Sequence, residues 1–135
     1  MSERKLVYVA SPYAGNIEQN VKAAIYYCRY ALQCGCDFIA PHLFYPRVLD
    51  DSDPSERRIG IQAGLRLLSM ADELWVYGSR ISEGMKSEIA EAERLGTPIK
   101  YIAESEILGG SRMNRYGKMG QNSEETPASG FSLKL

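Results

Sequence analysis

The sequence has few of the residues that build metal centres and disulfide frameworks. Its 135 residues include one histidine, His42, and three cysteines, Cys28, Cys34 and Cys36. A single histidine and the absence of a carboxylate cluster with metal-loop spacing argue against a metal site. An odd number of cysteines without a CxxC pair is typical of reduced thiols in a cytosolic protein. No metal and no organic cofactor is therefore expected.

A bias toward one charge and long apolar runs are also missing. Lysine and arginine number 16 against 17 aspartates and glutamates, so the net charge is −1 and no basic footprint for nucleic acid exists. No uninterrupted apolar run is long enough to cross a bilayer. The N-terminus has only a short apolar segment, unlike a signal peptide. We expect a cytoplasmic protein without nucleic-acid or membrane partners.

Short apolar runs alternate with amphipathic segments through most of the chain. Strands are expected at 5–10, 37–40, 73–77 and 98–102. Helices are expected at 16–33, 55–70 and 82–96, with Asn16, Ser55 and Ser82 as their N-terminal caps. Strands that alternate with helices imply parallel βαβ units. We predict a three-layer α/β domain with a parallel sheet of four to five strands.

Two further expectations concern the first helix and the end of the chain. The inward face of the helix is expected to hold Val21, Ala24, Ile25, Cys28, Ala31 and Leu32. Its tyrosines, Tyr26, Tyr27 and Tyr30, suggest a subunit interface and hence a homo-oligomer. From Gly109 the composition shifts to Gly, Ser, Asn and Glu, which predicts a domain at 1–108 and a flexible or partner-ordered tail at 109–135. Asn114 and Asn122 could supply polar groups to a neighbouring subunit's site.

Glu88 is a carboxylate on the apolar side of a predicted helix. At about 100° per residue, Met85, Ile89, Ala92 and Leu95 form one stripe, and Glu88 falls inside it. A buried carboxylate is costly unless it is hydrogen-bonded or protonated, so this position indicates a functional site. The alternative is a glutamate at the edge of the stripe, whose carboxylate reaches water.

Several loops are expected to meet Glu88 at one edge of the sheet, because ligands of open α/β sheets bind beyond the carboxyl ends of the strands. The candidate binding residues there are Ser11, Pro12, Gly15, Asn16, His42, Ser82, Gly84 and Met85. Ser82 begins a helix whose N-terminus can receive an anion. Glu88 lies about 9 Å farther along that helix, roughly the length of a pentose phosphate. Tyr13 is either an aromatic at the edge of the core or a hydroxyl that orients the carboxylate.

Three motifs together resemble the nucleoside 2-deoxyribosyltransferase superfamily. They are VYVASPYAG, ADELWVYG and SEGMKSEIAEAERLGTP, which fall within residues 5–102. The superfamily includes transferases that exchange bases on deoxyribonucleosides and hydrolases that cleave nucleoside monophosphates at the N-glycosidic bond. The segments VASPYAG and APHLFYPR, with a GIxxGL helix, are similar to a compact bacterial and phage branch.

The resemblance implies a flavodoxin-like fold with Glu88 as the nucleophile and Tyr13 as the tyrosine beside it. Ser82 stands where the monophosphate hydrolases have serine, which favours a nucleoside 5′-monophosphate over a free nucleoside. The family's aspartate that handles the leaving base is replaced here by Gly64. Proton transfer to the base would then fall to another group, such as His42 or Asp50.

The predicted function is cleavage or transfer at the N-glycosidic bond of a nucleoside or nucleoside 5′-monophosphate. One alternative is a non-catalytic nucleotide or nucleotide-sugar sensor with the same fold, which the glycine at position 64 favours. The other is an interaction protein that engages a partner through its tail and its tyrosine face.

Overall fold

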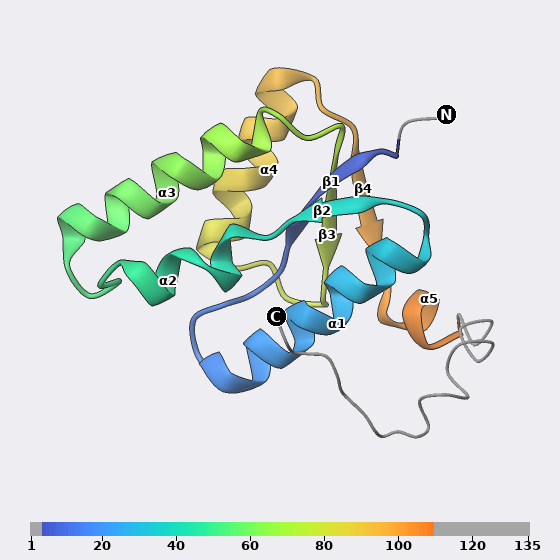
Figure 1. Ribbon diagram of the computed structural model, residues 1–135, viewed down its shortest axis with the longest axis horizontal. Coiled ribbons are helices and arrows are strands. Elements are labelled where there is room, and N and C mark those ends of the chain that lie inside the picture. Colours follow the sequence, from blue (N-terminus) through green and yellow to red (C-terminus); the bar gives the residue numbers. More distant parts are fainter. Residues whose placement is uncertain (1–3, 110–135) are drawn as a thin grey trace. The chain divides into compact units, whose positions relative to one another are not determined.

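The computed structural model describes residues 4–109 of the chain (Figure 1). The chain divides into two units, Met1–Ile102 and Ala103–Leu135. In the second unit the structure describes helix α5, Glu104–Gly109. Apart from Gly109, the predicted tail, with Asn114 and Asn122, lies outside the described residues.

The first unit contains a parallel sheet of four strands. They are β1 (Leu6–Ala10), β2 (Asp37–Ile39), β3 (Glu73–Tyr77) and β4 (Ile99–Ile102). The strand order is β2-β1-β3-β4, so β1 and β3 are central. Each predicted strand is present, with ends that differ by at most one residue. Strands buried on both faces need apolar residues at consecutive positions, and β1 and β3 meet this need.

Helices cover both faces of this sheet, which confirms the predicted three-layer α/β fold. They are α1 (Ile17–Gln33), α2 (Tyr45–Val48), α3 (Pro54–Leu68) and α4 (Glu83–Leu95), with a short 3₁₀ helix, η1, at Pro41–Leu43. Alternate side chains of a strand point to opposite faces. Tyr8 and Ala10 accordingly join a core cluster with Leu68 of α3 and Met85 of α4.

The opposite face of the sheet carries α1, and its packing corrects our expectation for that helix. Tyr27 is buried and stacks on Tyr77 of β3 with ring centroids 4.5 Å apart. Tyr30 contacts the rings of Trp75 and Tyr77. These tyrosines therefore belong largely to the core, because the aromatic residues of β3 provide a platform beneath α1.

The exposed side of α1 holds other residues than Tyr27 and Tyr30. Ile25 and Leu32 were expected inside, yet they are 55% and 46% exposed, and Tyr26 is 44% exposed. The predicted homo-oligomer stays a prediction, and these apolar side chains are the part of α1 available for it. No helix in the described residues is long and apolar enough to span a membrane, and the cytoplasmic location stays a prediction.

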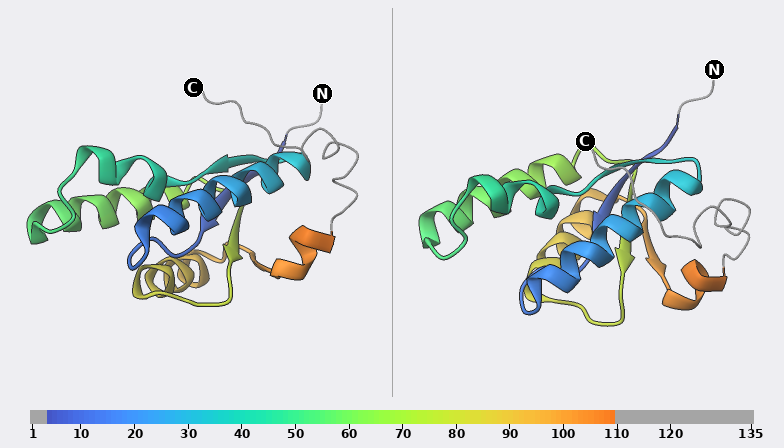
Figure 2. Two further views of the ribbon diagram at one scale, coloured as in Figure 1. Left: turned by 90° about the horizontal axis from the view of Figure 1, so that it is seen from below. Right: turned by 60° about the horizontal axis from the view of Figure 1, so that its bottom comes forward.

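The segment 41–57 contains η1, α2 and the first turn of α3. It lies beside α3 in each view (Figure 2). Helix α3 begins at Pro54, and its N-terminal cap is Asp53 rather than the predicted Ser55. The Asp53 carboxylate accepts hydrogen bonds from the Ser55 N–H and Oγ, both at 2.9 Å. Proline suits the first helical position because its missing N–H has no intrahelical partner there.

The corrected cap can be tested by comparing Asp53→Ala with Ser55→Ala. Asp53→Ala should lower the Tm by roughly a few degrees, since an N-terminal cap satisfies backbone donors that otherwise have no partner. Ser55→Ala should lower it less. Thermal unfolding followed by circular dichroism at pH 7 measures both effects. A larger loss for Ser55→Ala would restore Ser55 as the cap.

Candidate active site

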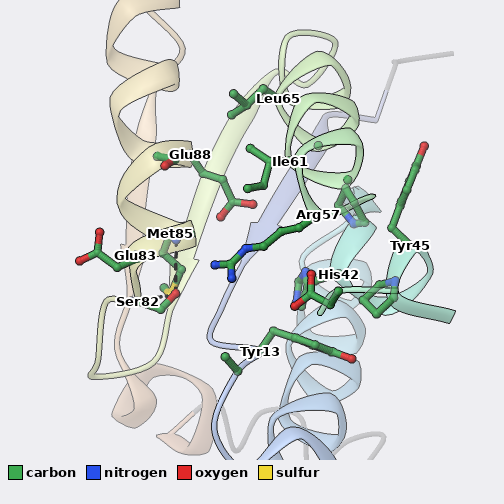
Figure 3. A pocket seen from close by; sticks show the side chains of 18 of the residues that line it. Tyr13, His42, Tyr45, Arg57, Ile61, Leu65, Ser82, Glu83, Met85 and Glu88 are labelled. Atoms are coloured by element: carbon green, nitrogen blue, oxygen red, sulfur yellow. Dashed lines mark hydrogen bonds between the residues drawn. The ribbon is translucent and has the colours of Figure 1, made fainter. Parts of the chain in front are cut away.

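A cavity of about 440 Å³ opens at the carboxyl end of β1, between the segment 41–49, α3 and the first turns of α4 (Figure 3). Of the predicted site residues, the following line it: Ser11, Tyr13, His42, Ser82, Gly84, Met85 and Glu88. These seven residues come from three separate segments of the chain, 11–13, 42 and 82–88, which the fold brings to one cavity. No group of three or more metal-ligating side chains is present in the part of the chain that the structure describes.

Glu88 lies in the wall that α4 contributes, one turn after Met85. Its side chain is half-buried, and its Oε2 accepts a hydrogen bond of 2.6 Å from the Tyr8 hydroxyl. Burial raises the pKa of Glu88 to about 7, and the hydrogen bond from Tyr8 opposes this rise. Near neutral pH the carboxyl group therefore exchanges readily between its charged and neutral forms.

Tyr8, rather than the predicted Tyr13, is the tyrosine that contacts Glu88. Tyr8 is the third residue of β1 and is 1% exposed, with its side chain on the α3 and α4 side of the sheet. Its pKa is raised well above the usual range, first by burial and then by the charge of Glu88, so the hydroxyl stays protonated and donates. Tyr13 lines another part of the cavity, below His42 in the view of Figure 3.

Gly64 makes room for the Tyr8 hydroxyl. A Cβ atom at position 64 would lie 3.2 Å from the Tyr8 Oη, which is tighter than an ordinary van der Waals contact between carbon and oxygen. Gly64 is buried in the middle of α3, where glycine is otherwise unfavourable. The aspartate that the resemblance leads one to expect at this position would therefore compete with Tyr8 for space.

A second polar pair, Ser11 and His42, also lines the cavity, and His42 lies across it from Glu88 in the view of Figure 3. Ser11 Oγ and His42 Nε2 are 3.0 Å apart. Burial lowers the pKa of His42 to about 4, so its imidazole is neutral at pH 7. A neutral imidazole donates one hydrogen bond and accepts another. His42 is therefore suited to form hydrogen bonds with a polar ligand edge. It is not in the imidazolium form at neutral pH, so it does not act as a general acid there.

The N-terminus of α4 opens onto the same cavity. Ser82 caps the helix, and its Oγ accepts from the Met85 N–H at 3.3 Å. The Ser82 N–H approaches the Met85 sulfur at 3.4 Å. The N–H groups of the first helical turn have no intrahelical partner and carry the positive end of the helix dipole. The anion site stays a prediction, and the helix N-terminus on which it depends lies at the cavity wall.

Three predicted binding residues do not line the cavity, namely Pro12, Gly15 and Asn16. The Asn16 side chain accepts from the Gln19 N–H at 3.2 Å and caps α1. Gly15 has a φ of 100°, which suits the turn before that helix. Pro12 lies near Gly78. Asp50, named as a possible acid, is also outside the lining, and its Oδ1 accepts from the hydroxyl of Ser52 at 2.6 Å.

Sequence reasoning missed the wall formed by α2 and α3. The added lining residues there include Tyr45, Leu49, Arg57, Gly60, Ile61, Gly64 and Leu65. The five from α3 follow the spacing i, i+3, i+4, i+7 and i+8, which marks one face of a helix. That spacing was a usable signal, because it places Arg57 on the same face as Gly64.

The raised pKa of Glu88 has a consequence for stability. A carboxyl group whose pKa is higher in the folded state destabilises the fold once it ionises, so its cost is absent near pH 4.5 and complete above pH 7. Glu88→Gln should therefore raise the free energy of unfolding by on the order of 1–3 kcal/mol at pH 8 and change it little at pH 4.5. Urea unfolding at the two pH values measures this difference. Equal effects at both would contradict the raised pKa.

The contact between Gly64 and Tyr8 can be measured with a double-mutant cycle. Gly64→Ala gains helix propensity of up to about 1 kcal/mol, but it crowds the Tyr8 hydroxyl. In a Tyr8→Phe background that crowding is gone, so Gly64→Ala should be more favourable there by about 0.5 kcal/mol or more. Gly84→Ala is the control, since its Cβ would meet nothing within 4 Å. An identical effect of Gly64→Ala in both backgrounds would refute the contact.

Comparison with known proteins bears on the fold and the family. The structure is similar to that of a 2-deoxyribosyltransferase from the psychrotolerant bacterium Bacillus psychrosaccharolyticus, with a TM-score of 0.60 and 17% identity over 73% of this chain and 72% of that chain. This likeness confirms the flavodoxin-like α/β fold expected from the sequence. No curated protein matches the sequence. Residues 5–102 match the model of a family described as a domain of unknown function, DUF7768, and the chain therefore belongs to that family.

Proposed function

We propose that the protein cleaves or transfers the N-glycosidic bond of a nucleoside or nucleoside 5′-monophosphate, with Glu88 as the nucleophile. The observation that carries this proposal is the 2.6 Å hydrogen bond from Tyr8 to Glu88 in the wall of a cavity that can hold a small molecule. The fold is shared with a 2-deoxyribosyltransferase, which supports the same class of reaction.

The proposed chemistry uses the two oxygens of Glu88 differently. Tyr8 holds Oε2, and Oε1 attacks the anomeric carbon of the sugar. The bond between that carbon and the base nitrogen breaks, the base leaves with the electron pair, and a glycosyl ester forms on Glu88. Water or a second base then attacks the same carbon and frees the carboxylate. Burial favours the attack, because a poorly solvated carboxylate is a stronger nucleophile.

The rest of the cavity provides the binding groups that such a substrate needs. The first turn of α4 at Ser82 supplies backbone donors for an anionic or hydroxyl-bearing part of the ligand. The Ser11–His42 pair supplies neutral hydrogen-bonding groups for a base edge. Tyr13 and Tyr45 add aromatic surface to the lining, which suits a flat base.

A second candidate function is a nucleotide sensor that binds without turnover. The observation that favours it is the α3 wall, where Gly64 stands in place of a carboxylate that could protonate the leaving base. His42, with a pKa of about 4, does not replace that acid at neutral pH. Under this alternative Glu88 and Tyr8 serve to bind a sugar hydroxyl.

Base release decides between the two functions. Purified protein is incubated with a panel of 2′-deoxynucleosides, ribonucleosides and their 5′-monophosphates, and free base is measured by chromatography. The rate should rise with pH through about 7, as Glu88 loses its proton, and fall at least about a thousandfold in Glu88→Gln. Glu93→Gln, an exposed change on the same helix, is the control and should leave the rate unchanged.

The opposite outcomes are equally informative. Base release that persists at the wild-type rate in Glu88→Gln would remove Glu88 from the nucleophile role. Thermal stabilisation by a nucleotide, without base release in either protein, would establish the sensor.

A further inference from the structure

Arg57 is an exposed cationic residue that lines the candidate active site. It lies on the pocket face of α3 together with Gly60, Ile61 and Gly64. Figure 3 shows its side chain reaching from α3 into the cavity, toward the wall that α4 forms. Gly60 and Gly64 add no side chain to this face, and they let Leu49 and the Tyr8 hydroxyl approach the helix there.

The guanidinium of Arg57 has no hydrogen bond or ion pair within the part of the chain that the structure describes. The ion pairs there join Arg4 to Asp37, Lys5 to Glu73, Lys86 to Glu83 and Arg94 to Glu91. Hydrogen bonds to arginine side chains involve Arg4, Arg47 and Arg94. The five N–H donors of Arg57 are thus available to a ligand or to solvent.

The four described carboxylates that line the cavity, those of Asp51, Glu56, Glu83 and Glu88, form no ion pair with Arg57. Glu56 accepts a 2.6 Å hydrogen bond from the Asp50 N–H, and Glu83 pairs with Lys86 at 3.3 Å. Glu88 accepts from Tyr8 and forms no ion pair with Arg57. Among the residues that the structure describes, Arg57 is also the one lysine or arginine that lines the cavity.

An arginine in this position is suited to a phosphate. The planar guanidinium binds phosphate through two parallel hydrogen bonds, which are stronger than bonds between neutral groups. Arg57 lies seven residues before Gly64, about 10 Å along the axis of α3, and Gly64 faces the Tyr8 hydroxyl beside Glu88. Measured along the helix axis, the backbone positions of Arg57 and Gly64 are therefore separated by roughly the length of a sugar phosphate.

We propose that Arg57 binds the phosphate of the substrate and makes the protein selective for nucleoside 5′-monophosphates over nucleosides. This inference rests on the proposed function for the identity of the sugar and base. The part of the proposal that concerns phosphate binding rests on the free guanidinium in the cavity. It applies whether the ligand is turned over or only bound. Ribose 5-phosphate and a nucleotide share this chemistry, and the experiment separates them.

The experiment measures binding first, by isothermal titration calorimetry with the full chain. The probes are 2′-deoxynucleoside 5′-monophosphates, the matching nucleosides and ribose 5-phosphate. Arg57→Gln is compared with Arg58→Gln, because Arg58 is exposed on the same helix and does not line the cavity. Arg57→Lys keeps the charge without the planar fork. Thermal melts confirm that each variant is folded.

Wild-type protein should bind monophosphates more tightly than nucleosides. The ratio of the nucleoside Kd to the monophosphate Kd should fall about 10- to 100-fold in Arg57→Gln, fall less in Arg57→Lys and stay unchanged in Arg58→Gln. Ribose 5-phosphate binding that is lost in Arg57→Gln assigns the contact to the phosphate. A second outcome is that monophosphates bind tightly, that this binding depends on Arg57, and that ribose 5-phosphate binds too weakly to detect. This outcome supports the nucleotide as the ligand.

Two results would overturn the proposal. One is the absence of any preference for monophosphates in the wild-type protein. The other is the same Kd ratio in Arg57→Gln and Arg58→Gln. Both results can be told apart from a failure of the proposed function. In that case no base is released, but the Arg57-dependent binding of monophosphates remains. If base release does occur, the ratio of kcat/KM for monophosphate and nucleoside should follow the same order of variants.

Discussion

The burial of one carboxylate beside one phenol determines how the rest of this site is arranged. Glu88 is withdrawn from water by the packing of α4 on the sheet, and the Tyr8 hydroxyl compensates for part of the lost hydration. Tyr8 can do so only because β1 points its side chain toward α3 and α4. A glycine in α3 in turn makes room for the hydroxyl. A strand and two helices are therefore adapted to a single hydrogen bond.

Electrostatics divides the cavity into parts with different chemistry. The Glu88 side holds a group whose charge changes near neutral pH, whereas the Ser11–His42 side stays neutral. Arg57 supplies the permanent positive charge between α3 and α4. A ligand with an anionic end, a polar ring and an electrophilic carbon between them matches this division.

The sequence was informative about the elements and less so about their contacts. Apolar runs and caps such as Asn16 and Ser82 are local signals, so the strands and α4 could be predicted closely. Asp53 was missed because Ser55, two residues later, also fits the preferences of a cap. The inward face of α1 was misjudged because Ile25 is more apolar than Tyr27. Only the aromatic surface of β3 explains why the tyrosine is buried.

The same limit explains the result at the site. Glu88 broke a local pattern and could be found from it, but its partner Tyr8 lies 80 residues away in sequence, inside a strand where a tyrosine looks like an ordinary core residue. The helical spacing of Arg57, Gly60 and Gly64 was visible in the sequence. Its meaning required knowing that this face of α3 covers a cavity rather than the core.

The position of Tyr8 within the sheet has a consequence for motion. Strand β1 is hydrogen-bonded to a strand on each side, and such central strands open only when most of a domain unfolds. The segment 41–57 on the far wall has short helices and few long-range backbone bonds, and it belongs to the part of a protein that opens at low cost. The tyrosine that holds the carboxylate thus lies in a strand that is paired on both sides, whereas the facing wall is held together by local backbone hydrogen bonds.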